Sequence, residues 1–420
     1  MIRSLRTGIS GLRNHQVRMD VIGNNIANVN TVAFKRSRVA FNELLGQKLL
    51  GLGRSAGGQG VNPATVGNGV AVASIDQDWN VGSFENTSIG TDLALAGDGF
   101  FIAEGIEGNV LTRAGNFRFN AAGNLVTSGG LAVQGWAFAE DGTLNTGQLQ
   151  DIYLDLDATA SPVETANVRL SGNLSADIDA TSDDNEVTRT SVIHDAQGKA
   201  HTLVMTMRKT DVDEWEIASV EIAGDPDAEP PVPPTALTVS AGTIEFDTDG
   251  NLVAPDPATF DITGTFPDSA GDDVAITLDI GDLTQYGGST TAAVSEQDGQ
   301  AAGRVISYGI NPSGILTVGF SNGEQRSIAQ LAIGTVNNPG GLEQLGENFY
   351  GATSVSGDLL IGRAGQEVVT SVVAGALEAS NVDLATEFTE MIVTQRGYQA
   401  SARVITTSDE LLQEVVQLKR

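Results

Sequence analysis

Apolar residues recur at heptad spacing in two stretches at opposite ends of the chain, residues 1–33 and 376–420. Alternating steps of three and four are typical of a helix that buries one side against another helix. We therefore predict a helix in each stretch. Seam positions and three asparagines near the end of the first seam are expected to mediate helix packing and assembly. These residues are Ile2, Leu5, Ile9, Leu12, Met19, Asn24, Asn25, Ile26, Asn28, Leu384, Phe388, Met391, Gln395, Tyr398, Ile405, Leu412 and Val416.

The C-terminal seam, counted from Leu377, contains three polar positions at intervals of fourteen residues. They are Asn381, Gln395 and Asp409. Polar residues in a helical seam reduce stability and commonly fix the register or the number of partners. We interpret them as determinants of register or of partner number.

The two terminal stretches carry opposite charge. Residues 1–38 hold seven bases and one acid, whereas residues 378–420 hold seven acids and four bases. This complementarity predicts that the two helices pair with each other. A single pair would leave much of each seam in water, so we expect other copies of the chain to complete the packing. We also expect the ends to be largely disordered before polymerisation, because isolated helices are marginally stable.

Small and polar residues interrupt the N-terminal helix. Gly8, Gly11 and Gly23 each cost helix stability, and a close approach between helices would explain them. The asparagine-rich run 24–31 has two interpretations, a helix stop or an amide network between packed helices. The sequence favours the helix stop.

Between the ends, short strand-like segments and glycine turns predict a mainly β protein. The fold class is therefore mainly β with a terminal α-helical coiled-coil pair, in which nested β domains are inserted between the helices. A short helix is possible at residues 41–50. The predicted domains are a helical inner-core domain from residues 1–33 and 376–420, a linker or arm at 34–75, a first β domain from 76–157 and 301–375, and an inserted acidic outer β domain at 158–300.

One local pattern recurs: an aromatic residue, a polar residue, then glycine and leucine. It occurs at residues 119–125, 138–144 and 246–252. Each predicts a strand, a tight turn and a second strand. In the third copy, the acids of residues 245–256 have the spacing of a calcium loop. Glutamate is a poor first ligand there and no flanking helices are visible, so we interpret this segment as a hairpin turn.

Composition narrows the classes of function. The 420 residues include 50 glycines and no cysteine, and the net charge is −30. Thirty acids and five bases fall within residues 151–300, a surface that repels nucleic acid. The sequence shows neither a signal peptide nor an eighteen-residue apolar segment. We therefore expect no membrane insertion, and either a cytoplasmic protein or export by a dedicated machine.

The sequence offers no persuasive site for chemistry. Its three histidines, His15, His194 and His201, are loosely spaced and more often structural than ligands. We therefore predict no catalytic residue, no metal and no cofactor, and a protein that is not an enzyme. A surface adhesin or carbohydrate-binding β protein would fit the middle of the chain but not its heptad ends, and a glycan hydrolase fits least.

Several motifs together resemble the bacterial flagellar rod and hook proteins. The motifs are Ser10-Gly11-Leu12, residues 24–28, 31–35, 92–95, 99–101, 112–117, 123–126, Gly135-Trp136, and at the C-terminus residues 381–384, Glu387, Met391-Ile392, residues 395–400 and Leu411-Leu412. The chain departs from the family pattern at Ala33, where glycine is usual, and at Asn120, where aspartate is usual. The resemblance leaves residues 158–300 almost uncovered.

The resemblance implies a structural subunit that is exported unfolded through the flagellar type III apparatus and polymerises outside the cell. The large insertion at 158–300 favours the hook, a flexible curved tube that acts as a universal joint and transmits motor torque from rod to filament. A distal rod protein is the alternative. The implied partners are many copies of the chain itself, the distal rod protein, the hook cap, the hook–filament junction proteins and the export apparatus.

Overall fold

The computed structural model describes residues 2–50, 64–106, 108–139, 141–182, 184–224, 232–240, 242–267 and 273–417. The chain divides into two compact units. Unit 1 comprises Met1–Asp155, Tyr308–Val318 and Arg326–Arg420, and unit 2 comprises Leu156–Ser307 and Gly319–Gln325. The predicted class, mainly β with one helix near each end, is confirmed.

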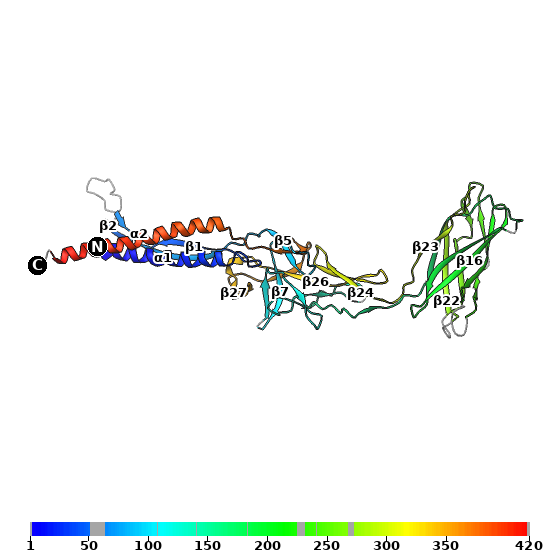
Figure 1. Cartoon of the computed structure of the whole chain (residues 1–420), viewed down its shortest axis with the longest axis horizontal. Helices are drawn as coiled ribbons and strands as arrows, with labels where there is room; N and C mark the ends of the chain where they lie inside the picture. Colours follow the sequence, from blue (N-terminus) through cyan, green and yellow to red (C-terminus); the bar gives the residue numbers. More distant parts are fainter. Residues whose placement is uncertain are drawn as a thin grey trace, which may run out of the picture. The chain divides into compact units, whose positions relative to one another are not determined.

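The two helices of unit 1 are α1 (Ile2–Ala27) and α2 (Leu384–Gln417), and they lie side by side (Figure 1). They run antiparallel, because Ser4 contacts Ser408 whereas Asn25 contacts Glu387. Helix α2 starts later than the predicted seam. Leu377 belongs to strand β31 (Ala376–Glu378), so that part of the helix prediction was wrong.

Asp383 sets the start of α2 as an N-cap residue. Its carboxylate accepts hydrogen bonds from the Ala385 amide at 3.0 Å and from the Thr386 hydroxyl at 2.5 Å. These two hydrogen bonds, that of the Thr386 hydroxyl first, hold the pKa of Asp383 below its usual value. The carboxylate therefore stays ionised and keeps capping the helix at neutral pH.

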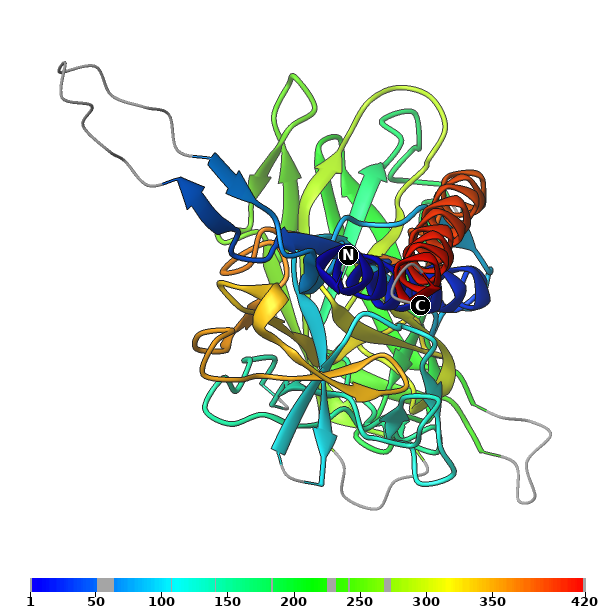
Figure 2. The ribbon, with the colours of Figure 1, turned by 90° about the vertical axis from the view of Figure 1, so that its left-hand side faces the viewer.

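A β hairpin-like pair follows α1 in the chain. Strand β1 (Ser37–Glu43) pairs antiparallel with β4 (Val70–Gln77), and β1 lies beside α1 (Figure 2). Beyond it, β2 (Gln47–Leu50) pairs with β3 (Ala64–Val66). The possible helix at 41–50 was therefore a wrong prediction, because pairing with distant strands outweighs local propensity. Residues 51–63 of the predicted arm lie outside the described residues.

The β core of unit 1 centres on β26 (Gln325–Thr335) and continues in the order β26-β7-β8-β28-β27. Strands β11 and β29 also pair with β26, β30 pairs with β6, and β31 pairs with β5. Residues 93–95 of β6 and 100–103 of β7 are buried. The other bounds are β5 Phe84–Asn86, β6 Leu93–Gly97, β7 Phe100–Gly105, β8 Gly108–Thr112, β9 Arg118–Phe119, β10 Leu125–Val126, β11 Gln134–Ala137, β12 Gln150–Asp151, the 3-10 helix η1 Pro339–Gly341, β27 Glu343–Gly346, β28 Phe349–Gly351, β29 Leu360–Arg363 and β30 Thr370–Ala374.

Unit 2 is a β domain in which buried and exposed residues alternate along the strands, as a sheet with one buried face requires. Its strands follow the order β15-β16-β17-β18-β21-β22-β14-β23 around a core that includes the fully buried Trp215. The bounds are β13 Thr159–Ala160, β14 Asn167–Asn173, β15 Glu186–His194, β16 Ala200–Asp211, β17 Glu214–Ile222, β18 Thr235–Val239, β19 Thr243–Phe246, β20 Leu252–Ala254, β21 Thr259–Thr265, β22 Asp273–Thr284 and β23 Ala293–Gln297; β24 Gly303–Ile310 and β25 Ile315–Phe320 have residues in both units.

The three predicted strand–turn–strand units are confirmed. Phe119 pairs with Leu125, residues 138 and 144 form a bridge, and β19 pairs with β20. In the third turn, Asp247 Oδ1 accepts the amides of Asp249 at 2.9 Å and Asn251 at 2.8 Å. The aspartate thus closes the hairpin turn, which is the interpretation preferred over a calcium loop.

Ala33 occupies a backbone conformation that favours glycine. Its φ is +57° and its side chain is buried, while its N–H donates to the Glu378 carbonyl at 2.8 Å. A positive φ is tolerated poorly by residues with a branched Cβ. Glycine, which the resemblance leads us to expect at this position, would adopt this φ without strain.

We expect Ala33→Val to lower the free energy of unfolding by about 2 kcal/mol or more, since a β-branched residue at this φ must also fit a filled site. Ala33→Gly should change the free energy of unfolding by less than about 1 kcal/mol. Glycine adopts this positive φ without strain, and that gain offsets the loss of a buried methyl group. Urea titrations of both variants measure these differences. Equal stabilities for the valine and glycine variants would contradict the argument.

Candidate assembly site

The interface between α1 and α2 consists mainly of small and polar residues. The hydroxyls of Ser4 and Ser408 lie 3.2 Å apart, and Arg18 donates to Glu390 at 3.1 Å. Thr394, in the middle of α2, is fully buried. The helices therefore approach closely through hydroxyls, glycines and one ion pair rather than through large apolar side chains.

Glycines permit this approach. A Cβ added at Gly8 would lie 3.0 Å from Ile405 Cγ1, and one at Gly11 would lie 2.9 Å from the Ser401 hydroxyl. On the other helix, a Cβ at Gly397 would lie 2.7 Å from the His15 ring. The predicted close approach is confirmed for Gly8 and Gly11. At Gly23 the two helices do not approach closely, because an added Cβ would meet nothing within 4 Å.

His15 packs over Gly397 in this interface. Burial, with a smaller effect of the nearby Arg18 charge, lowers the pKa of His15. The imidazole is therefore neutral at pH 7, and it contacts the edge of Phe41 with ring centroids 6.1 Å apart. A structural role is consistent with this position, as for His201, which bonds the buried Asp195 at 3.1 Å.

The register of the interface differs by one residue from the apolar seams found in the sequence. Residues that contact the other helix or are buried beside it follow the 4-3 spacing of Ser4, Gly8, Gly11, His15, Arg18, Ile22 and Asn25 on α1, and of Glu387, Glu390, Thr394, Gly397, Ser401, Val404 and Ser408 on α2. Each precedes a position of the apolar seam. One residue corresponds to a rotation of about 100° around a helix.

The apolar seams consequently lie beside the interface. Among the residues chosen from the sequence, Ile9 is 38% exposed, Leu384 39% and Phe388 51%, and Gln395 is also exposed. The side chains of Ile2 and Val416 lie outside the described residues. Half-buried at the edge of the interface are Leu5, Leu12, Met19, Ile26, Met391, Tyr398, Ile405 and Leu412.

Asn25 forms an amide network between the helices. It is 1% exposed; its Oδ1 accepts the Ser37 amide at 3.0 Å, and its Nδ2 donates to the Ser37 carbonyl at 2.8 Å. The same Nδ2 donates to the Glu387 carboxylate at 3.1 Å. The amide network, the less favoured of the two interpretations of residues 24–31, is therefore confirmed for Asn25. The helix stop also holds, because α1 ends at Ala27 and Asn28 donates back to the Asn24 carbonyl.

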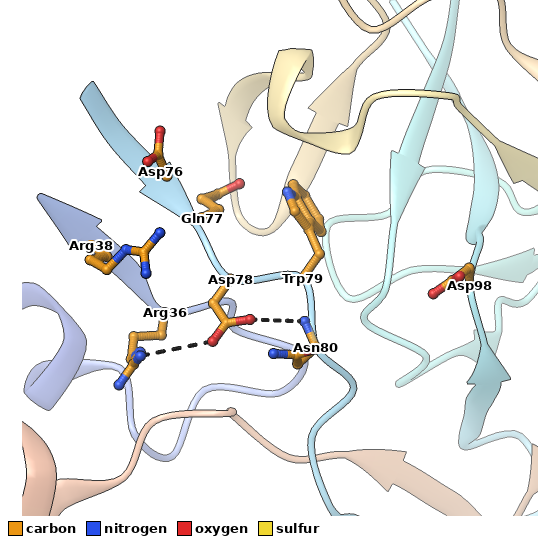
Figure 3. Close-up of a pocket in the computed structure, with 8 residues that line it drawn as sticks. All are labelled: Arg36, Arg38, Asp76, Gln77, Asp78, Trp79, Asn80 and Asp98. Atoms are coloured by element: carbon orange, nitrogen blue, oxygen red, sulfur yellow. Dashed lines mark hydrogen bonds and ion pairs between the residues drawn. The ribbon is translucent and has the colours of Figure 1, made fainter. Parts of the chain in front are cut away.

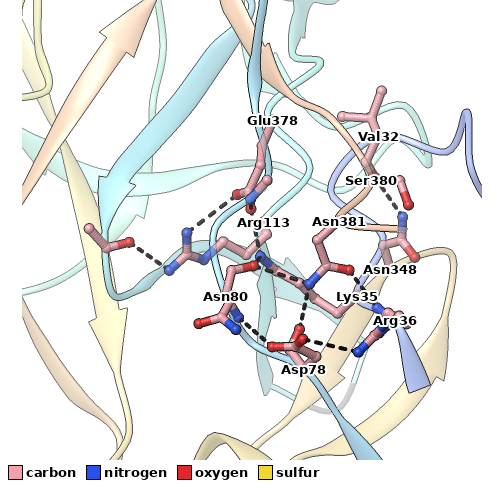
Figure 4. Close-up of polar contacts among 12 residues, drawn as sticks. Val32, Lys35, Arg36, Asp78, Asn80, Arg113, Asn348, Glu378, Ser380 and Asn381 are labelled. Carbon is pink, nitrogen blue, oxygen red and sulfur yellow. Dashed lines mark hydrogen bonds and ion pairs between the residues drawn. The ribbon is translucent and has the colours of Figure 1, made fainter. Parts of the chain in front are cut away.

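A buried ionic cluster anchors both terminal segments to the β core, and we call Lys35, Arg113 and Glu378 the ionic junction (Figure 4). Lys35 Nζ lies 2.5 Å and Arg113 Nη1 3.3 Å from the two Glu378 oxygens. The Gly82 amide donates to the same carboxylate at 3.0 Å. All three charged side chains are almost inaccessible to solvent.

Both cations of the ionic junction have a further acceptor, although the buried Nε of Arg113 has no hydrogen-bond partner among the described residues. Lys35 donates to the Asn80 carbonyl at 2.8 Å, and Arg113 Nη2 donates to the Gly97 carbonyl at 2.7 Å. Burial lowers the pKa of Lys35, and the charge of Glu378 opposes that shift. One carboxylate thus pairs with cations from two different segments. The sequence did not predict this cluster, because its only signals there were the presence of Lys35 and Arg113 in two family motifs.

Asn381, interpreted from the sequence as a polar seam position, lies before α2 and joins the two termini. Its Oδ1 accepts the Arg36 amide at 2.7 Å, and its Nδ2 donates to the Asp78 carbonyl at 2.7 Å (Figure 4). Asn348 similarly donates to the Val32 carbonyl at 2.8 Å. These amides hold the chain between the helices and the β core in one conformation.

A polar groove of about 390 Å³ lies beside this region (Figure 3). Charges of both signs line it, and Arg36 lies 3.8 Å from Asp78. No nucleophile with an adjacent base is present among its lining residues, which are Arg36, Arg38, Asp76, Gln77, Asp78, Trp79, Asn80 and Asp98. Within the described part of the chain, no group of three or more His, Asp or Glu side chains is placed to hold a metal ion. No described helix is long and apolar enough to cross a membrane.

Family models cover most of the chain. They are the flagella basal body rod protein at residues 5–35, the flagellar hook protein FlgE/F/G D1 domain at 94–176, the flagellar basal body protein FlaE D2 domain at 155–300 and the flagellar basal body rod FlgEFG protein C-terminal at 373–418. The D2 match spans the segment that the sequence motifs left uncovered.

Comparison with full-length relatives indicates the same family as the family models. The chain is 37% identical to the flagellar hook protein FlgE of Treponema pallidum and 34% identical to that of Borreliella burgdorferi, each over the full length of both chains. It is 30% identical to FlgE of Salmonella typhimurium over 99% of this chain and all of that one. The Helicobacter pylori hook protein FlgE2 shares the fold, with a TM-score of 0.51 at 17% identity over 70% of this chain and all of that one. The chain therefore belongs to the flagellar hook protein FlgE family, and is a structural subunit of the bacterial flagellar hook.

Proposed function

We propose that many copies of this chain polymerise into the flexible, curved tube of the hook, which transmits torque from rod to filament. The observation that carries the proposal is the α1–α2 interface. This interface is formed by small and polar residues, and apolar residues beside it, such as Ile9 and Phe388, remain partly exposed. A helix pair with exposed apolar stripes is stabilised when other helices cover them.

The proposed roles of the segments follow from this. Residues 1–33 and 376–420 form the inner core, the arm at 34–75 links it to the first β domain, and residues 158–300 form an outer domain. The acidic composition of 151–300 supports an outward position, because like charges at high local concentration keep such surfaces soluble. Weak polar contacts between outer domains would break and form again as the tube bends.

The further partners are proposals as well. They are the distal rod protein, the hook cap, the hook–filament junction proteins and the type III export apparatus, with the polymer located outside the cell. The ionic junction supports such a subunit role rather than catalysis, since its charged groups are buried and occupied by one another. We accordingly propose that the chain is not an enzyme.

Electron microscopy of basal bodies from cells that lack this gene tests the proposal. We expect complete rods that end without hooks, and hooks restored when the gene is returned. Truncated rods would instead support a distal rod protein. Intact hooks and filaments in the deletion cells would overturn the proposed function.

A further inference from the structure

The sequence contains two Asn-Gly pairs, Asn68-Gly69 and Asn322-Gly323. In such a pair the glycine amide nitrogen can attack the asparagine Cγ, because no Cβ on the glycine hinders the approach. The nitrogen loses its proton, bonds to Cγ and displaces Nδ2 as ammonia, which leaves a five-membered succinimide. Water then opens this ring to aspartate or to isoaspartate, in which the backbone passes through Cγ and is one atom longer. The surrounding structure decides whether the nitrogen and the Cγ are free to meet.

Both reacting groups of the second pair are held in place. The turn between β25 and β26 uses the Gly323 amide, which donates to the Phe320 carbonyl at 3.0 Å. Asn322 Nδ2 donates to the Ala301 carbonyl at 3.0 Å, and a Cβ added at Gly303 would lie 2.7 Å from Asn322 Cγ. The attacking nitrogen and the attacked carbon of this pair are therefore both immobilised by the fold.

The first pair, which precedes β4, is much less restrained. Asn68 is exposed, and its side chain makes one hydrogen bond among the described residues, from Nδ2 to the Leu45 carbonyl at 2.7 Å. The Gly69 amide donates no hydrogen bond within the described part of the chain. An exposed hydrogen bond is readily exchanged for one to water, so its loss costs little free energy. The side chain of Asn68 can therefore turn toward an unoccupied backbone nitrogen.

Gly69 itself has no room for a changed backbone. Its φ is +107°, and an added Cβ would collide with the Ser10 hydroxyl and lie 3.5 Å from Thr7 Cα, both on α1. The Gly69 carbonyl accepts the Leu44 amide at 2.9 Å, directly beyond the last pair of β1 and β4. One extra backbone atom immediately before this glycine cannot be accommodated while both the helix contact and this hydrogen bond are kept.

We propose that Asn68 is a site of spontaneous deamidation, and that its isoaspartate product loosens the start of β4 from α1 while Asn322 stays intact. The reaction consumes only water and needs no enzyme. Because it is slow and irreversible, the modified fraction records the age of a subunit. This chemistry is independent of the proposed role in torque transmission.

Mass spectrometry of isolated hooks tests the site. The hooks are incubated in mildly alkaline buffer, which favours attack by the amide nitrogen, and are then digested with pepsin at acid pH, where the reaction is slow. We expect Asn68 to be converted at least about tenfold faster than Asn322, because the second pair must first break its hydrogen bonds. The chain unfolded in urea is the reference for intrinsic reactivity, and there the two asparagines should react at similar rates.

The effect on the fold is measured by hydrogen exchange of the Leu44 amide. Asn68→Asp is the matched control, because it has the charge of the deamidated chain without the extra backbone atom. We expect faster exchange at Leu44 in hooks that carry isoaspartate than in Asn68→Asp hooks. Asn68→Ser, which has no side-chain carbonyl carbon, should show no conversion at this position.

Two results would overturn the proposed site. One is an equal rate at Asn68 and Asn322 in hooks, and the other is an unmodified Asn68 in hooks under conditions in which the unfolded chain reacts. Equal exchange at Leu44 in the isoaspartate form and in Asn68→Asp would overturn the proposed effect on β4.

Discussion

Replacement of Glu378 by alanine is expected to lower the free energy of unfolding of unit 1 by about 3–5 kcal/mol. The carboxylate is 1% exposed and lies 2.5 Å from Lys35 Nζ and 3.3 Å from Arg113 Nη1. Its removal leaves two cations buried without a counter-charge. The loss of the Gly82 hydrogen bond adds to the cost.

Amide hydrogen exchange can measure this effect in each unit separately. Peptides from β6 and β30 report on unit 1, and peptides from β16 report on unit 2 as an internal reference. Glu343→Ala is the matched control, because Glu343 is exposed and forms no ion pair among the described residues. We expect the control to stay within about 0.5 kcal/mol of the unmodified chain. Equal protection of β6 and β30 in both variants would show that the ionic junction is not needed for stability.

The second large effect is expected for Gly8→Val, which should abolish hook formation. An added Cβ would lie 3.0 Å from Ile405 Cγ1 and 3.3 Å from the Ser401 carbonyl oxygen, and valine adds two methyl groups beyond it. Backbone atoms cannot move aside as a flexible side chain can, so α1 would be forced away from α2. Overpacking of this kind costs about 1–3 kcal/mol per site, and every copy in a polymer bears that cost.

Hook length in complemented deletion cells, and the temperature at which isolated hooks dissociate, measure the outcome. Gly8→Ala should give hooks that dissociate at a lower temperature, because the smaller side chain needs only a small shift. Gly309→Val is the control, since an added Cβ there meets nothing within 4 Å. Hooks of normal length and thermal stability from Gly8→Val would contradict the close packing of α1 on α2.

Periodicity in the sequence was sufficient to predict the elements whose determinants are local. The heptad spacing from Leu5 to Ile26 and from Leu384 to Leu412 located the two helices, and opposite charge predicted that they pair. Phenylalanine, glycine and leucine at fixed spacing likewise located the three hairpin turns, because a turn such as that of Asp247 closes through hydrogen bonds within five residues. Local chemistry of this kind is readable without knowledge of the rest of the fold.

Segments that depend on distant partners were harder to predict. Residues 41–50 were given a possible helix, yet Phe41 and its neighbours pair with β4, some thirty residues away in the chain. The ionic junction joins Lys35 to Glu378 across 343 positions. A lone lysine and a lone glutamate carry no mark of such a pairing, so only the tertiary structure reveals it.

The sequence by itself determined which residues are apolar and that they line one stripe of each terminal helix. Only the tertiary structure decided which stripe faces which partner. Glycine and serine at positions such as Gly8, Gly11 and Ser401 allow the two helix backbones to approach more closely than the neighbouring leucines and isoleucines would permit. The chain therefore packs its small residues against itself and leaves its large apolar residues partly exposed, because close backbone approach is possible only where side chains are small.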